Sequence, residues 1–209
     1  PVGREMELPV AEADVDRAAE LLARAGVADG DPVVMLNPGA AYGPSKLWPA
    51  ERYAAVADEL AARHGAAVVI NAAPDEREVA RLVERHMAGA PALNLAREDN
   101  SLGLVKAFAG RARVVVTNDT GARHVAAAVG SAVVTVFGST DPVWARIDYP
   151  RERIVRAEVP CAPCQRKRCP LPPGAGFHRC MEAVAVEDVL AAVEALWAVP
   201  AEEKETPAA

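Results

Sequence analysis

Aromatic residues are scarce in this sequence of 209 residues, which has three each of Trp, Tyr and Phe. Since 51% of the residues are nevertheless hydrophobic, the core has to be aliphatic, and runs such as AAVVI (66–70) and SAVVTVF (131–137) supply it. No apolar run reaches the ~18 residues of a membrane-spanning helix. The length is ample for a real core, so the sequence predicts one globular domain.

Positive charge is also limited. The chain has 23 Lys and Arg residues against 29 Asp and Glu residues, a net charge of -6. An acidic surface repels phosphate backbones, which argues against nucleic acid as the main partner. No secretory signal is visible, and we therefore expect a cytoplasmic protein.

The ends of the sequence differ in composition from its middle. The first residue is Pro1 rather than Met, and PVGREMELPV reads as a linker. We therefore expect residues 1–10 to be the remnant of an interdomain linker that follows a missing N-terminal portion. Residues 11–199 form the predicted domain, which includes a cysteine-rich segment at 160–181. Residues 200–209 are polar and rich in Pro and Ala, which predicts a disordered tail.

Short β-branched runs alternate with amphipathic stretches along the chain. They predict strands at 32–37, 66–71, 92–95, 113–118 and 132–138, and helices at 12–25, 49–65, 75–88, 101–111, 120–130 and 186–199. This alternation is typical of βαβ units, and so of an α/β fold with a Rossmann-like parallel sheet that has helices on both faces. Ligands bind outside the carboxyl ends of such strands. The candidate loops follow Asn37, Asn71, Asn118 and Gly138.

Two common phosphate-binding patterns are absent. A P-loop has the spacing G-x-x-x-x-G-K-[ST], whereas here three residues separate Gly39 from Gly43 and Lys46 follows Gly-Pro-Ser. No G-x-G-x-x-G follows a predicted strand, which disfavours a dinucleotide-dependent dehydrogenase. What remains in NPGAAYGPSKLWP (37–49) is a loop of small residues with one lysine, which suits a phosphate oxygen. The alternative is a solvated loop lysine.

A second candidate site lies at the junction of a predicted strand and helix in VVVTNDTGARHVAAAVG (114–130). Asp119, Thr120 and Gly121 occupy this junction, where the unpaired N–H groups and partial positive charge of a helix N-terminus attract phosphate. Gly121 permits close approach of a ligand, and His124 falls in the first turn. Alternatively, Asp119 is a simple N-cap and His124 a half-buried structural histidine.

Taken together, the motifs resemble those of a known family. NPGA…GPSKLWP, NDTGARHVAAAVG and VFGSTDP, in this order, are similar to the ADP-heptose:lipopolysaccharide heptosyltransferases, and GPSKLWP is most similar to the heptosyltransferase II form. The resemblance covers about residues 33–190. It implies a GT-B glycosyltransferase, in which two Rossmann-like domains face each other across a cleft. This chain resembles the C-terminal half, which binds the nucleotide-sugar donor.

The resemblance assigns Lys46 to the phosphates of the donor, as the catalytic residue. It places Asp119, Thr120 and Gly121 against the sugar and the pyrophosphate, with His124 nearby. Breaking the heptosyl–phosphate bond leaves ADP with growing negative charge, which Lys46 and the helix N-terminus would stabilise most in the transition state. The implied mechanism needs no metal and no cofactor.

An acidic position in NAAPDERE (71–78) resembles the one that holds the ribose hydroxyls of the donor. A carboxylate is apt there because it accepts hydrogen bonds from two adjacent hydroxyls. We choose Glu76, with Asp75 or Glu78 as alternatives. Three small residues complete the expected donor site: Gly39, Ala40 and Ala41. At the positions of Ala40 and Ala41 some relatives carry hydroxyl residues, and backbone N–H groups would replace those side-chain contacts.

The resemblance also implies the partners. The donor would be ADP-heptose, and the acceptor would be the lipopolysaccharide core, bound by a missing N-terminal domain that supplies an acidic general base. We therefore expect this chain alone to bind donor weakly and to transfer nothing. Contact with the inner membrane would be peripheral at most. Two alternatives remain, a GT-B-shaped sugar-nucleotide epimerase and an inactive nucleotide-binding module.

Four cysteines fall within twenty residues: Cys161, Cys164, Cys169 and Cys180. The first pair has the C-x2-C spacing of zinc ligands, but the second pair is C-x10-C, unlike a regular zinc ribbon. A cytoplasmic location disfavours disulfides. The sequence leaves three interpretations open, namely a zinc-bound knuckle, a disulfide and reduced thiols, and we include no metal ligand among the site residues. The basic run QRKR (165–168) either contacts acceptor phosphates or a membrane surface, or is a solvated loop.

Overall fold

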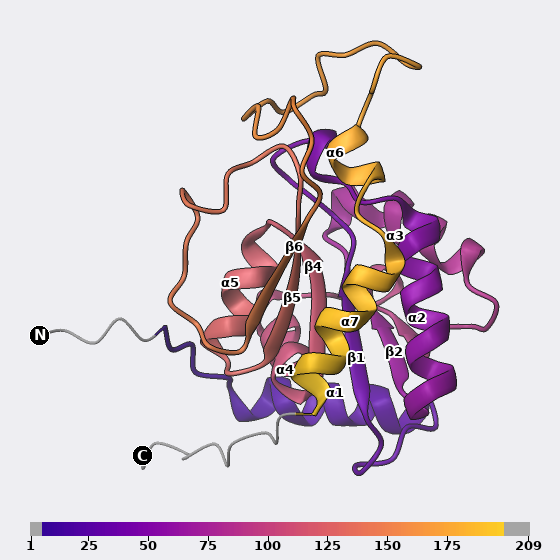
Figure 1. Cartoon of the computed structure of the whole chain (residues 1–209). Helices are drawn as coiled ribbons and strands as arrows, with labels where there is room; N and C mark the ends of the chain where they lie inside the picture. The colour runs from indigo at the N-terminus through magenta and orange to yellow at the C-terminus, as the bar shows by residue number, and fades with distance from the viewer. Residues whose placement is uncertain (1–5, 199–209) are drawn as a thin grey trace, which may run out of the picture.

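A computed structural model describes residues 6–198, which form a sheet of six parallel strands with helices on both faces (Figure 1). The strand order is β3-β2-β1-β4-β5-β6. The strands are β1 (Val33–Asn37), β2 (Ala67–Ile70), β3 (Leu93–Asn94), β4 (Val114–Asn118), β5 (Ala132–Phe137) and β6 (Glu152–Arg156). The predicted Rossmann-like α/β fold is confirmed.

The helices are α1 (Glu12–Arg24), α2 (Ala50–His64), α3 (Arg77–His86), α4 (Leu102–Arg111), α5 (Gly121–Ala128), α6 (Arg179–Glu182) and α7 (Val186–Trp197). From β1 to β5 the helices α2 to α5 connect successive strands in the expected alternation, whereas β5 and β6 follow each other without a helix between them. Three short 3-10 helices lie in loops, namely η1 (Pro44–Lys46), η2 (Pro74–Glu76) and η3 (Leu95–Arg97).

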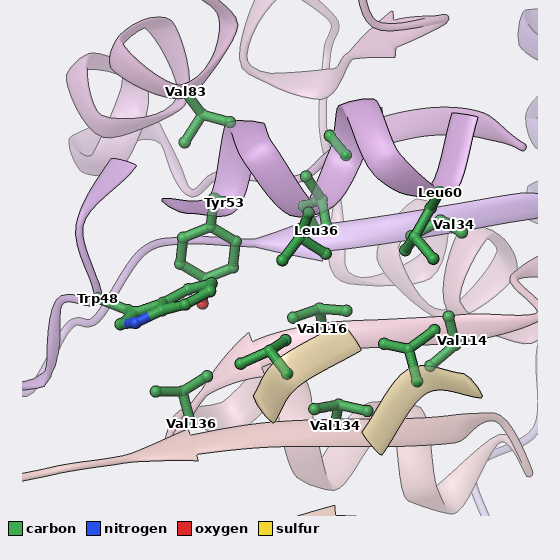
Figure 2. Packing of buried hydrophobic residues seen from close by; sticks show 14 of the residues in the cluster. Val34, Leu36, Trp48, Tyr53, Leu60, Val83, Val114, Val116, Val134 and Val136 are labelled. Atoms are coloured by element: carbon green, nitrogen blue, oxygen red, sulfur yellow. The ribbon is translucent and has the colours of Figure 1, made fainter. Parts of the chain in front are cut away.

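The central strands β1, β4 and β5 are buried along their whole length, which explains their continuous apolar runs. Successive side chains of a strand point to opposite faces of the sheet. Val34 and Val116 pack in the layer of α2 and α7 (Figure 2), whereas Val33 and Val115 pack in the layer of α1 and α4. Burial of each such side chain contributes about 1.5–3 kcal/mol to the free energy of unfolding, so packing on both faces stabilises the sheet.

The strand order places a topological switch between β1 and β4. The chain runs outward from β1 through β2 to β3 and then returns to the other side of β1 as β4, in a register that sets Asn37 opposite Thr117. The connections after neighbouring strands therefore leave in opposite directions, which opens a crevice at their carboxyl ends. The loops after β1 and β4, which carry the two candidate phosphate motifs, meet at this crevice.

Two elements were not predicted from the sequence, β6 and α6. The β6 residues ERIVR are half-buried or exposed, so the strand has no continuous apolar run. It is held instead by parallel pairing with β5, in a register that sets Val133 opposite Glu152. Backbone pairing of this kind has little trace in composition, which is why a pattern of hydrophobic residues did not reveal it.

The predicted ends of the domain lie only partly within the described residues. Residues 1–5 and 199–209, which include half of the expected linker and the whole expected tail, lie outside them. In the described part of that linker, the N–H of Leu8 donates to the carbonyl of Ala128 at 3.1 Å, and Lys106 Nζ donates to the carbonyl of Pro9 at 2.6 Å. Between residues 6 and 198, no helix is both long enough and apolar enough to cross a bilayer.

Trp48 joins the loop after β1 to the C-terminal part of the domain. Its side chain is 1% exposed, and its ring meets Tyr53 edge-on with centroids 5.0 Å apart (Figure 2). Its Nε1 donates to the carbonyl of Val184 at 3.1 Å. The ring therefore fills the space between segments that are far apart in the sequence.

We expect Trp48→Ala to lower the free energy of unfolding by about 3–5 kcal/mol, because it removes a buried ring and leaves a cavity. Urea denaturation of the whole chain measures this loss. Trp144→Ala is the matched control, since Trp144 is 86% exposed. It should change the free energy of unfolding by no more than about 0.5 kcal/mol. Equal losses in the two variants would contradict the packing described for Trp48.

Candidate functional site

The loops after β1 and β4 meet through a buried ion pair. Lys46, at the end of η1, donates from Nζ to Oδ2 of Asp119 at 2.5 Å and to the backbone carbonyl of Asp119 at 2.8 Å. The two side chains are 11% and 8% exposed. Lysine is rarely buried to this extent without a carboxylate partner, so the pair fixes the ammonium group at the carboxyl end of β4. Two residues predicted from separate motifs are thus in direct contact.

A buried asparagine at the end of β4 holds the loop that carries Lys46. Asn118 Nδ2 donates to the carbonyls of Pro38 at 2.8 Å and Gly39 at 3.2 Å, and its Oδ1 accepts from the N–H of Trp48 at 3.3 Å. Buried polar groups cost free energy unless they are hydrogen-bonded, so a fully paired amide favours one path for the loop. Asn118 therefore holds both ends of this loop, the start through Pro38 and Gly39 and the end through Trp48.

Two further groups bind the carboxylate of Asp119. Thr140, in the loop after β5, donates from Oγ1 to Oδ2 at 2.8 Å, and Arg123 Nη1 lies 3.8 Å from Oδ1. Arg123 is fully buried and pairs with Glu152 on β6, with 2.5 Å between Nε and Oε1. Oδ2 of Asp119 thus accepts hydrogen bonds from Lys46 and Thr140, and Oδ1 lies at ion-pair distance from Arg123. The carboxylate therefore orients the ammonium group of Lys46.

A cavity of about 330 Å³ opens beside the ion pair. Its lining residues are Ala41, Tyr42, Lys46, Asp119, Thr120, Gly121, His124 and Ala145. The Tyr42 ring contacts the ammonium group, with Lys46 Nζ 4.7 Å from the ring centroid. The volume is within the range of small-molecule sites. Of the residues predicted from the sequence, Gly39, Ala40 and Glu76 lie outside this lining.

The N-terminus of α5 forms one wall of the cavity. Its N-cap is Thr120 rather than Asp119, and no side-chain hydrogen bond caps the helix. The Thr120 hydroxyl lies 3.3 Å from both Asn37 Nδ2 and Thr117 Oγ1 instead. N–H groups in the first turn of a helix lack the usual partner four residues back, although that of Arg123 donates to the carbonyl of Thr120 at 3.2 Å. A Cβ at Gly121 would meet nothing within 4 Å. This open, partially positive wall favours an anion.

His124 follows in the first turn of α5 and is half-buried. Burial lowers its pKa below the usual range for histidine, and the positive charge of Arg123 lowers it further. The imidazole is therefore neutral at pH 7. It offers the cavity a hydrogen-bonding group, not a second cation.

Glu76 lies beside the small-residue loop rather than in the cavity lining. Its Oε2 accepts from the N–H of Ala73 at 3.2 Å. The carboxylate also packs against Gly39 so closely that any Cβ at this position would collide with it. Burial raises the pKa of Glu76, with a further contribution from the charge of Asp75. A ligand that reached Glu76 would therefore pass over the backbone of the loop after β1.

The two alternatives to Glu76 are placed differently. Asp75 is exposed, and Glu78 forms ion pairs with Arg81 at 3.8 Å and Arg85 at 3.1 Å along α3. Of the three acidic candidates, Glu76 is the one in contact with the loop after β1. The structure therefore distinguishes three acidic residues that the sequence alone offered as alternatives for one position.

Three side chains that contact Lys46 or Asp119 were not identified from the sequence: Tyr42, Arg123 and Thr140. Thr140 lies within VFGSTDP, so a signal was present but was not assigned to the site. Nothing in the sequence marks Arg123, because its partner Glu152 is 29 positions away on a strand that was itself not predicted. Tyr42 gives no signal either, since a loop tyrosine is ordinarily solvated.

All four cysteines are free thiols in this structure. They line a cavity of about 60 Å³ together with residues of the loops after β1 and β5. In the part of the chain that the structure describes, no three His, Cys, Asp or Glu side chains are placed to hold a metal ion. In this structure the four thiols are thus reduced and gathered around one small cavity.

Comparison with known sequences identifies one family. Glycosyltransferase family 9 (heptosyltransferase) matches residues 2–174. Lipooligosaccharide heptosyltransferase 2 of Campylobacter jejuni serotype O:2 is 27% identical over 168 residues, which cover 78% of this chain and 50% of the relative. The same enzyme of Haemophilus influenzae is 33% identical over 116 residues, which cover 54% of this chain and 33% of the relative.

Solved structures share the fold. Escherichia coli ADP-heptose lipopolysaccharide heptosyltransferase II is similar with a TM-score of 0.72 and 24% identity, over 91% of this chain and 53% of that chain. A family 9 glycosyltransferase of Veillonella parvula gives a TM-score of 0.77 and 24% identity, over 93% and 54%. The chain thus spans about half the length, or less, of these relatives.

We expect Glu76→Gln to raise the free energy of unfolding at neutral pH and to lose this effect on acidification. Because the folded-state pKa is raised, the ionised carboxyl destabilises the fold at pH values above both the folded and unfolded pKa. The penalty falls as pH drops and is absent once both states are protonated. Gln keeps an oxygen acceptor for the N–H of Ala73.

Urea denaturation at neutral pH and at about pH 3.5 measures the difference, since an unperturbed glutamate titrates near 4.3. Glu78→Gln is the matched control, because it removes the same charge from a side chain that is 66% exposed. A gain for Glu76→Gln that persists unchanged in acid would contradict the raised pKa.

Proposed function

Since the chain belongs to glycosyltransferase family 9, the heptosyltransferases, we propose that it is the donor-binding half of a GT-B enzyme that moves heptose from ADP-L-glycero-D-manno-heptose to the lipopolysaccharide inner core. The other half would bind the acceptor and supply the general base. One observation carries the proposal, which is that the ammonium group of Lys46 and the N-terminus of α5 line the same cavity. A diphosphate placed there would contact both.

Lys46 has one donor left for this ligand. An ammonium group has three N–H bonds, and two of them are directed to the carboxylate and the backbone carbonyl of Asp119. The third is available to a phosphate oxygen in the cavity. The pair with Asp119 therefore sets the direction of the remaining N–H before any ligand binds.

Asp119 itself would not contact the pyrophosphate through its carboxylate, because the like charges repel each other. Its Oδ2 accepts from Lys46 and Thr140, and its Oδ1 lies 3.8 Å from Arg123 Nη1. We therefore assign it a positioning role and leave the phosphate contacts to Lys46 and the backbone at Gly121. This differs from the expectation that the Asp119 side chain lies against the sugar and pyrophosphate.

The chemistry supplied by this half is stabilisation of the leaving group. When the bond between heptose C1 and the phosphate oxygen breaks, its electrons stay with ADP, and negative charge grows on the β-phosphate. Lys46 and the first turn of α5 line the cavity where this charge would develop, so they would stabilise it without a metal ion. Fixed donors of this kind favour the transition state over the ground state.

The nucleoside would lie over the loop after β1. Glu76, beside Gly39, would accept hydrogen bonds from the two ribose hydroxyls. The backbone of Ala40 and Ala41 would border the phosphates between Glu76 and the cavity. His124, whose imidazole is neutral, would hydrogen-bond to a sugar hydroxyl, because a hydroxyl needs a hydrogen-bonding partner rather than a positive charge.

Two other functions are compatible with a nucleotide-binding fold of this kind, a sugar-nucleotide epimerase and an inactive nucleotide-binding module. Family membership does not favour the sugar-nucleotide epimerase, which would also need groups for proton transfer on the sugar. An inactive nucleotide-binding module would share the fold without binding the donor. A cytoplasmic location, with at most peripheral contact to the inner membrane, follows from the proposed acceptor.

We expect the chain to bind ADP in preference to UDP, and Lys46→Ala to weaken ADP binding by about 10- to 100-fold. This corresponds to one lost charge-assisted hydrogen bond, about 1.5–3 kcal/mol. Isothermal titration calorimetry with ADP, UDP and ADP-heptose measures the affinities. Lys106→Ala is the matched control, because Lys106 lies on α4 outside the cavity lining.

Lys46→Ala leaves the buried carboxylate of Asp119 without the ammonium group that it pairs with, which could destabilise the variant. Urea denaturation therefore checks that the variant is folded. The double variant Lys46→Ala/Asp119→Asn removes the unpaired charge and should show the same loss of affinity. Unchanged ADP affinity in a folded variant would contradict the role of Lys46. Preference for UDP would support the epimerase, and no binding of any of the three ligands would support the inactive module.

A further inference from the structure

The cysteine segment, residues 160–181, lies over the loop that carries Lys46, beyond the carboxyl ends of the strands (Figure 1). Three consecutive carbonyl groups of this segment accept hydrogen bonds from that loop, those of Gln165, Arg166 and Lys167, and we call them the carbonyl clamp. The carbonyl of Gln165 accepts from the Tyr42 hydroxyl at 2.9 Å. Those of Arg166 and Lys167 accept from the hydroxyl of Ser45 at 2.5 Å and from its N–H at 3.2 Å. The clamp therefore fixes the residues that immediately precede Lys46.

The clamp is in close contact with the loop. A Cβ at Gly43 would lie 2.5 Å from the carbonyl oxygen of Lys167, and the φ of +154° at Gly43 also favours glycine. The Tyr42 ring contacts two ammonium groups, with Lys46 Nζ at 4.7 Å and Lys167 Nζ at 5.6 Å from its centroid. A shift of the clamp would thus change the surroundings of Lys46 directly.

The four thiols belong to the same segment as this clamp. They line one small cavity with Ser45 and Ser139, and the N–H of Gln165 donates to the carbonyl of Ser139 at 2.8 Å. Cys161 is exposed and Cys164 is half-buried. Cys180 is buried, and burial together with the other three thiols raises its pKa to about 11, so it stays protonated at neutral pH.

We propose that Cys161 and Cys164 form a modification site for small anionic disulfides such as glutathione disulfide, and that their oxidation loosens the carbonyl clamp and weakens donor binding. The exposed side chains of Arg166, Lys167 and Arg168 follow directly and would attract a reagent that carries carboxylates. The effect on the donor rests on the proposed function, whereas the effect on the clamp does not.

The reaction is a thiol–disulfide exchange in two steps. The Cys161 thiolate attacks one sulfur of glutathione disulfide, the S–S bond breaks, and one glutathione thiolate leaves. The Cys164 thiolate then attacks the sulfur of Cys161 and displaces the second glutathione. The two cysteines lose two electrons to form one disulfide, and the reagent gains them and ends as two thiols that take up the two protons.

The new bond would act on Lys46 through the chain itself. A disulfide holds its sulfur atoms about 2.05 Å apart, whereas both thiols are free here. Gln165 is bonded directly to Cys164, so movement of Cys164 displaces the carbonyl that holds Tyr42. Because packed loops do not deform continuously, the neighbouring hydrogen bonds to Ser45 would weaken with it.

The test compares the reduced chain with the chain after treatment with glutathione disulfide, with the 161–164 bridge confirmed by peptide mass spectrometry. Hydrogen exchange of the 42–47 peptide should accelerate by about tenfold on oxidation, since one 1.4 kcal/mol interaction corresponds to this factor. ADP affinity, measured by calorimetry, should fall by a similar factor. Both changes should be reversed by a dithiol reductant.

Cys161→Ser/Cys164→Ser is the matched control and should show neither change. Ser45→Ala removes one hydrogen bond to the clamp without altering a thiol, so it should accelerate exchange in 42–47 before any oxidation. Absence of a 161–164 bridge, or a bridge that leaves the exchange unchanged, overturns the inference. Faster exchange in a chain that binds no ADP when reduced supports the modification site and contradicts the proposed function instead.

Discussion

The ion pair between Lys46 and Asp119 is the contact on which the arrangement of the site depends. It joins the loop after β1 to the end of β4, across the point where the order of the strands reverses. Removal of two charges from water costs several kcal/mol per ion, which is offset only where their remaining hydrogen-bonding capacity is also satisfied. Here Thr140 and Arg123 complete the partners of Asp119, and the carbonyl of Asp119 accepts a second N–H of Lys46. Neither loop can therefore move independently without leaving a buried charge unpaired.

The fold was largely predictable because burial on both faces leaves a strong sequence signal. The strands β1, β4 and β5 are continuous apolar runs, and the helices between them have regular amphipathic patterns. β6 was missed for the same physical reason, since it lies at the edge of the sheet and none of its residues belongs to a continuous buried apolar run. A strand that is held by backbone pairing and by one ion pair, between Glu152 and Arg123, has no distinctive apolar pattern. The sequence therefore predicts the centre of this sheet better than its edge.

At the site, residue types were predictable and their partners were not. Lys46 and the junction at Gly121 were chosen because a cation and a helix N-terminus suit phosphate, and both line the cavity. Asp119 was expected to lie against the sugar and the pyrophosphate; it lines the cavity, and its carboxylate also contacts Lys46 and Thr140 from two other loops and Arg123 from the next helix. A single sequence does not specify such contacts between distant positions. Glu76 could be separated from its neighbours only by its contact with Gly39, which is also non-local.

On the proposed function, the charge balance of the site bears on how sugar transfer could be favoured over binding of the donor. Two buried pairs, Lys46 with Asp119 and Arg123 with Glu152, cancel within the protein, and the lowered pKa of His124 keeps its imidazole neutral. What remains for a ligand is one N–H of Lys46 and the partial charge of the α5 N-terminus. These directional donors act most strongly on charge that develops at a fixed point, and only weakly on a diphosphate charge that is already spread over many oxygens. On the proposed function, a neutralised cavity would therefore limit the ground-state affinity for ADP-heptose while it still stabilises the departing phosphate, and this difference is what lowers a barrier.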